Sequence, residues 1–110
     1  ITPRLTPAAS RGEAAAAALE VLTRDTSAGG ASADERHTAA ALLDDELRRA
    51  VAFVARSQLP PGPRPLFAHP HDVEGGFPGS AVDLQIRIDY VQHAGSMMIR
   101  WLELTARAHP

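Results

Sequence analysis

The segment from Leu59 to Ser80 limits the possible folds of this chain more than any other. It carries prolines at 60, 61, 63, 65, 70 and 78 and glycines at 62, 75, 76 and 79, which prevent a regular helix or strand. Irregular connections longer than about 12–15 residues are uncommon inside a compact domain. Since the segment also contains large apolar side chains, we expect residues 59–82 to form an ordered loop packed on its neighbours, anchored by Leu66, Phe67, Val73 and Phe77.

Helical patterns lie on both sides of this loop, and no strand pattern competes with them. Ser10-Arg11-Gly12-Glu13 reads as a capping box before an alanine-rich run, which predicts a helix over residues 11–24. Ser32 and Glu35 repeat the device before a second apolar stripe, which predicts a helix over 33–57. We therefore predict an all-α fold: a helical hairpin, the long ordered loop, and a third helix over 85–107.

The third helix is strongly amphipathic. At about 100° per residue, its polar side chains fall within a wedge about 80° wide. Apolar side chains cover another side of the helix, which we expect to face the core. The polar wedge consists of Asp89, His93, Ser96, Arg100, Glu103 and Arg107, and the predicted core side of Tyr90, Val91, Ala94, Met97, Met98, Trp101, Leu102 and Thr105.

Composition bounds the class of protein. A chain of 110 residues has the length of one domain, and its opening, ITPRLTP, suggests a C-terminal fragment of a longer chain. The formal net charge is −2 and the basic residues are scattered, so we expect neither nucleic-acid binding nor membrane insertion. The eleven basic residues are all arginine, which indicates a GC-rich coding sequence. We expect a soluble, cytoplasmic, bacterial protein.

Asp89 and His93 are the candidate catalytic residues. An acid and an imidazole four residues apart share one helix face, the spacing used when a carboxylate orients a histidine. The alternative interpretation is that both begin a solvated stripe, because every later member of that stripe is polar. The residues name no reaction, and whether the chain is an enzyme stays open.

The loop supplies further candidate ligands. His69 and His71 flank a proline, and in an extended segment their side chains would project on the same side. Together with Asp72 or His93, they could hold a divalent metal through nitrogen and oxygen ligands. The spacing matches no standard zinc motif, so we expect no cofactor and keep the metal site as an alternative. Glu74-Gly75-Gly76-Phe77 is read as a structural turn.

Part of the chain, about residues 50–104, resembles the repeat unit of α/α toroids. These are the barrels of paired helices found in squalene and hopene cyclases and in protein prenyltransferase β subunits. In such repeats an outer helix often ends in glutamine, a G-G-F-type turn follows, and an inner helix begins with an acid and an aromatic residue. The matching positions here are Gln58, Gly75, Gly76, Phe77, Asp89 and Tyr90.

The resemblance implies a pocket and no particular activity. The chain has no D-x-D-D run, and without cysteine it lacks the complete zinc ligand set of the prenyltransferases. In a toroid, the loops and the N-termini of the inner helices gather at one mouth of the cavity. The implied pocket for a small molecule or glycan would therefore be lined by His69, His71, Asp72, Phe77, Asp89, Tyr90 and His93.

Two functions follow from these observations. The first is that the chain is the C-terminal segment of a toroid-like protein and contributes its loop and the start of its last helix to that pocket. The second is a small helical interaction or dimerisation module without catalytic activity. The expected partner is the remainder of a parent chain or a second helical subunit, and a homo-oligomer is one form of the latter.

Overall fold

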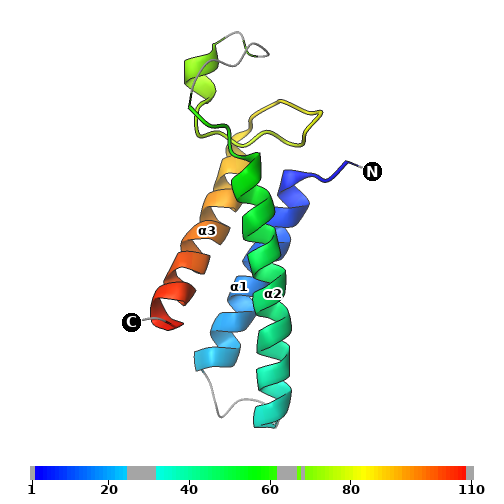
Figure 1. Ribbon diagram of the computed structural model, residues 1–110, viewed down its shortest axis with the longest axis vertical. Coiled ribbons are helices and arrows are strands. Elements are labelled where there is room, and N and C mark those ends of the chain that lie inside the picture. The colour runs from blue at the N-terminus through cyan, green and yellow to red at the C-terminus, as the bar shows by residue number, and fades with distance from the viewer. Residues whose placement is uncertain (1, 25–31, 62–66, 68, 109–110) are drawn as a thin grey trace.

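The computed structural model describes residues 2–24, 32–61, 67 and 69–108, and Leu66 lies outside them (Figure 1). The elements are α1 (Leu5–Arg24), α2 (Ala33–Ser57), the short 3-10 helix η1 (Pro70–Val73) and α3 (Ile88–Ala108). Across these ranges the only β-type pairings are isolated bridges from Arg4 to Ser80 and from Pro78 to Ile86. The predicted all-α class is confirmed.

The first helix begins earlier than predicted. It starts at Leu5, so Ser10 lies inside α1 and caps nothing, and the prediction of a start at residue 11 is wrong. The Leu5 N–H donates to the carbonyl of Gly79 at 2.9 Å, and a loop distant in sequence therefore serves the first turn. Pro7 fits there because N–H groups of a first turn have no intrahelical acceptor.

The second and third helices lie close to their predicted positions. α2 has the expected bounds, and the hydroxyl of Ser32 accepts from the Glu35 N–H at 3.1 Å. α3 begins at Ile88, three residues after the predicted start at 85. None of the helices in the described ranges is long and apolar enough to cross a membrane.

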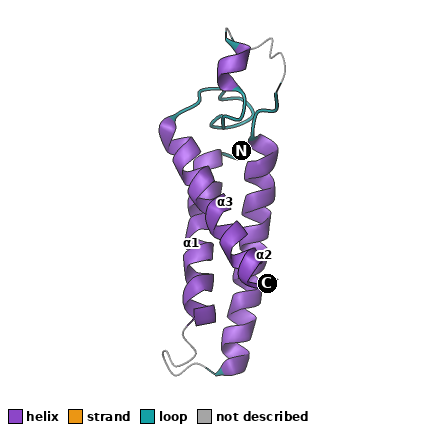
Figure 2. Cartoon of the chain, turned by 90° about the vertical axis from the view of Figure 1, so that its left-hand side faces the viewer, coloured by secondary structure: helices purple, strands orange, loops and turns teal. Residues whose placement is uncertain are grey.

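α1 contacts both other helices, whereas α2 and α3 barely touch. α1 and α3 run in the same direction and α2 runs antiparallel to them (Figures 1 and 2). The side-chain pairs Glu13–His93 and Glu20–Arg100 both join residues 80 apart in sequence, so the register between α1 and α3 is constant along the pair. The molecule measures 55 × 34 × 18 Å and is therefore thin, with long helix surfaces on its outside.

Gly12 marks the point where the three helices meet. A Cβ atom built at Gly12 would lie 2.8 Å from Met97 Cγ on α3 and 3.1 Å from Ala50 Cβ on α2. The missing side chain of Gly12 therefore leaves the room that Met97 and Ala50 fill, as close packing of the interior requires. The core side chains are Leu5, Ala9, Ala15, Ala16, Leu19, Leu47, Ala50, Val54, Phe77, Tyr90, Ala94 and Met97.

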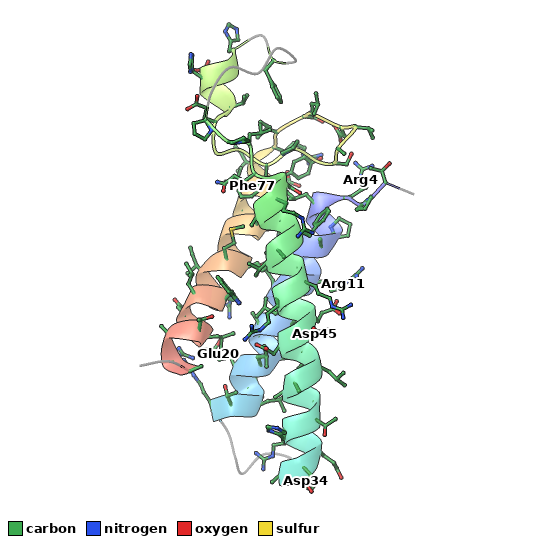
Figure 3. All side chains as sticks on the ribbon, viewed as in Figure 1. Arg4, Arg11, Glu20, Asp34, Asp45 and Phe77 are labelled. Carbon is green, nitrogen blue, oxygen red and sulfur yellow. The ribbon has the colours of Figure 1, made fainter. Side chains whose placement is uncertain are left out.

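The described parts of the loop are fastened to the ends of the helices. Leu59 and the two glycines exchange backbone hydrogen bonds: the Leu59 N–H donates to Gly76 at 2.9 Å, and the Gly75 N–H donates to Leu59 at 2.8 Å. The amide of Gln58 donates to the Gly75 carbonyl at 3.0 Å. Phe77 is buried beneath the loop, and η1 stands beyond it at the far end of the molecule (Figures 1 and 3).

Candidate functional site

His93 faces α1. Its Nδ1 lies 2.6 Å from Oε1 of Glu13, and both side chains are about one-third exposed, at 33% and 28%. One heptad further along each helix, Arg100 donates to Glu20 at 3.3 Å. The polar wedge of α3 therefore meets acidic side chains of α1, an arrangement that neither of our two sequence interpretations of His93 described.

Glu20 makes several ion pairs at the lower end of the contact between α1 and α3. Its carboxylate lies 2.8 Å from Arg24 on its own helix, 3.3 Å from Arg100 and 3.6 Å from Arg107 on α3. Figure 3 places Glu20 between α1 and the last turns of α3. Since the Glu20 side chain is only 27% exposed, three guanidinium groups share one partly buried acid. We call Glu13, Glu20, His93, Arg100 and Arg107 the ionic seam.

Asp89 takes a different partner from His93. Its carboxylate accepts from Nε of Arg87 at 2.9 Å, and the Arg87 guanidinium lies 5.5 Å from the ring centroid of Tyr90. Tyr90 itself is buried against Gly79, where a Cβ atom would come within 3.2 Å of the ring. Although Asp89 and His93 lie on one helix face, no hydrogen bond joins them in the structure.

The loop candidates lie elsewhere. η1 projects from the end of the molecule beyond the first turn of α3 in both views (Figures 1 and 2). His71 and Asp72 are exposed on it, His69 is exposed directly before it, and Nδ1 of His71 lies 3.2 Å from Oε1 of Glu74. Within the described ranges, no three His, Asp or Glu side chains are arranged to hold a metal ion.

The seven residues proposed for the pocket are therefore distributed over three places. Phe77 and Tyr90 are in the core, and Asp89 and His93 lie on the polar wedge of α3. The other three are His71 and Asp72 on η1 and His69 directly before it. Gly75 takes φ +78°, and a Cβ atom at Gly76 would lie 3.0 Å from Ile86 Cδ1. These two glycines thus serve the turn and its packing.

A cavity that we did not predict lies between the loop and the ends of α1 and α2. Its volume is about 380 Å³ and its walls are mainly apolar, within the range of small-molecule sites. Among its polar side chains, Ser57 donates to the Phe53 carbonyl and Ser80 accepts from two loop N–H groups. Arg56, exposed at the rim, has no hydrogen bond or ion pair with the described residues.

The second unpredicted feature is an apolar stripe on the outside of α3. Ile88 is 89% exposed, Val91 44%, Ile99 59% and Leu102 59%. The assignment of Val91 and Leu102 to the core side was therefore wrong. The apolar arc of α3 is wider than the strip covered by α1 and α2, and these residues fall beyond the edge of that strip. We call Ile88, Val91, Gly95, Ile99 and Leu102 the outer stripe.

Comparison with protein-family models, with curated proteins and with solved structures found no match to this chain.

Proposed function

We propose that this chain is a helical association module, in which the outer stripe of α3 binds a further helix. The observation that carries the proposal is the exposure of four large aliphatic side chains along one face of one helix. At about 100° per residue, the five stripe positions fall within an arc of about 80°. This arc is narrower than the apolar stripe that a helix turns to a core, and is closer to the seam between two paired helices.

Isolated exposed apolar residues are ordinary on protein surfaces, whereas a contiguous patch marks an interaction site. Here the five stripe positions, Gly95 included, recur at intervals of three and four, which places the four exposed side chains on one helical face. The opposite side of α3 is already packed within the chain, because Tyr90, Ala94 and Met97 are buried in the core. α3 thus carries two apolar faces, and only one has a partner within the described structure.

The proposal is tested with a charge placed in the stripe. If the protein associates with itself, Ile99→Glu should abolish that association in analytical ultracentrifugation. If the stripe stays uncovered in solution, Ile99→Glu should abolish binding of the apolar dye ANS. Leu42→Glu on α2 is the matched control, because Leu42 is also well exposed, at 69%, and lies off the stripe. The proposal fails if both variants behave alike, or if wild type neither associates nor binds the dye.

A second candidate function is binding of a small amphipathic anion, and the cavity at the helix ends favours it. Its serines are engaged by backbone groups, so Arg56 is the polar group left to meet a ligand. An apolar cavity with one guanidinium at its rim suits a molecule with an aliphatic body and a carboxylate. The cavity uses the loop, as in our sequence-based proposal, but not the first turn of α3.

Helix directions support the toroid resemblance that accompanied the pocket. In such repeats an inner, an outer and an inner helix follow one another, and the outer helix runs antiparallel to the two inner ones. α1, α2 and α3 have these directions, and we propose the toroid-like segment together with this second candidate function.

Calorimetry with octanoate tests the cavity. Octanoate should bind more tightly than octanol, and Arg56→Gln should remove the difference, whereas Arg48→Gln, which breaks a pair on α2, should not. Equal binding of the two probes would exclude this site.

A further inference from the structure

We infer that the helix on the outer stripe is α3 of a second copy of this chain, packed antiparallel with Gly95 at the crossing point. This inference rests on the association function proposed above and adds the identity and the geometry of the partner. Three observations carry it: the spacing of the stripe, the open space at Gly95, and the hollow at one end of the stripe.

The stripe is symmetric about its centre. Val91 and Ile99 lie four residues before and after Gly95, and Ile88 and Leu102 lie seven residues before and after it. A two-fold interface requires that residue i of one copy meets residue j of the other and that j meets i. With Gly95 on the two-fold axis, Val91 meets Ile99 of the second copy and Ile88 meets Leu102, each pair occurring twice.

Gly95 leaves room at that axis. No atom of the described residues lies within 4 Å of a Cβ atom built there, so no packing contact in this part of the chain requires a glycine. Gly12 provides the comparison, because a Cβ atom built there collides with α2 and α3, so internal packing accounts for that glycine. A glycine inside a helix costs about 1 kcal/mol of helix propensity relative to alanine. Close approach of a second backbone would account for tolerating it at position 95.

The two ends of the stripe differ, and the difference bears on how two copies would pair. A hollow of about 390 Å³ at the N-terminal end is lined by Ile86, Arg87, Ile88, Val91 and Gln92 and is almost wholly apolar. At the other end, equally far from Gly95, the side chain of Leu102 is 59% exposed. Antiparallel pairing brings each Leu102 to the hollow of the other copy. Parallel pairing would set hollow against hollow and leucine against leucine.

The stripe is small for a dimer interface. From Ile88 to Leu102 the helix rises about 21 Å, and one helix pair of this length buries an area at the low end of specific interfaces, below about 1,200 Å². Such contacts are weak, so we expect a dimer that dissociates in the micromolar range. The weak contact also fits a surface that stays exposed in the single chain.

The absence of cysteine from the chain allows a direct test by cross-linking. Under mild oxidation, Gly95→Cys should form a disulfide-linked dimer, because a crossing at Gly95 brings two Cα atoms within the roughly 7 Å that a disulfide spans. An equimolar mixture of Ile88→Cys and Leu102→Cys should give the mixed dimer, in excess over either self-linked one. Ala41→Cys on the exposed face of α2 is the control for random collision.

Each outcome is decisive. Self-linked dimers of Ile88→Cys and of Leu102→Cys as the main products would mean parallel pairing and would overturn the inference. Cross-linking no greater than that of Ala41→Cys would also overturn it; if Ile99→Glu still changes association or dye binding, the proposed function stands with a different partner. Should Gly95→Cys itself weaken the pairing, the mixed Ile88 and Leu102 experiment leaves Gly95 intact and decides alone. Circular dichroism confirms that each variant is folded.

Discussion

Gly12→Ala tests the packing of the three helices at its tightest point. Alanine should raise helix propensity by about 1 kcal/mol. Its methyl group would meet Met97, which is completely buried, and Ala50, whose Cβ cannot rotate away. Overpacking of this kind costs about 1–3 kcal/mol. The net expectation is a loss of about 1 kcal/mol in the free energy of unfolding, measured by urea denaturation of dilute protein.

A second substitution, Met97→Ala, should reverse the sign of the effect that Gly12→Ala has on stability. Met97→Ala alone should cost about 2–5 kcal/mol through the cavity that it leaves. In that background the new methyl group has room, so adding Gly12→Ala should be neutral or should stabilise by up to about 1 kcal/mol. The difference between the two backgrounds is a coupling of about 1–2 kcal/mol, in the range measured for residues in contact.

Gly95→Ala supplies the matched control. It makes the same change on α3, at a site where nothing lies within 4 Å of the new atom. In dilute, monomeric protein it should stabilise by up to about 1 kcal/mol. If Gly12→Ala stabilised the protein as much as Gly95→Ala does, α1 would not meet α2 and α3 at Gly12, and the packing described above would be wrong.

Three further outcomes are expected from urea denaturation. Glu20→Gln should lower the stability by about 1 kcal/mol at low salt and by less at high salt, because three arginines share a partly exposed acid; an effect unchanged by salt would argue against the ionic seam. Ser32→Ala should cost about 1 kcal/mol through loss of the cap on Glu35, and no loss would mean that the cap does not form in solution. Phe77→Ala should cost about 3–5 kcal/mol because the ring is buried under the loop; a cost below 1 kcal/mol would mean that the loop does not pack there.

Local signals predicted the helices well where the cap residue is adjacent in sequence. Ser32 and Glu35 predict the start of α2, and the structure contains the expected hydrogen bond between them. The same signal at Ser10 was misleading, because α1 begins at Leu5 with its first N–H served by Gly79, far away in sequence. A capping box describes what a serine can do, whereas tertiary contacts decide where the first turn forms.

The two faces of α3 show the same limit of prediction from local sequence patterns. Periodicity separated the polar wedge from the apolar arc, but it could not say how much of that arc α1 and α2 would cover. Val91 and Leu102 fell outside the covered part for that reason. The ionic seam did leave a signal that we did not use: Glu13 and Glu20 are spaced by seven, as are His93, Arg100 and Arg107.

The candidate site was the least predictable part. Residue types placed His69, His71, Asp89 and His93 in one pocket by analogy with toroid repeats. In the structure, His69 and His71 lie at the start of η1 and on it, away from α3, and Glu13 contacts His93. The cavity beside Arg56 draws its walls from α1, α2 and the loop, and no local pattern in the sequence links these segments.

The measurement that tests the outer stripe most directly is a concentration series of amide NMR spectra. Between micromolar and millimolar protein, the resonances of Ile88, Val91, Gly95, Ile99 and Leu102 should shift together, and those of Glu13 and Leu42 should stay fixed. Ile99→Glu should remove the shifts. Shifts confined to α2 or to the loop, with the stripe unchanged, would contradict the assignment of this face of α3 as the association surface.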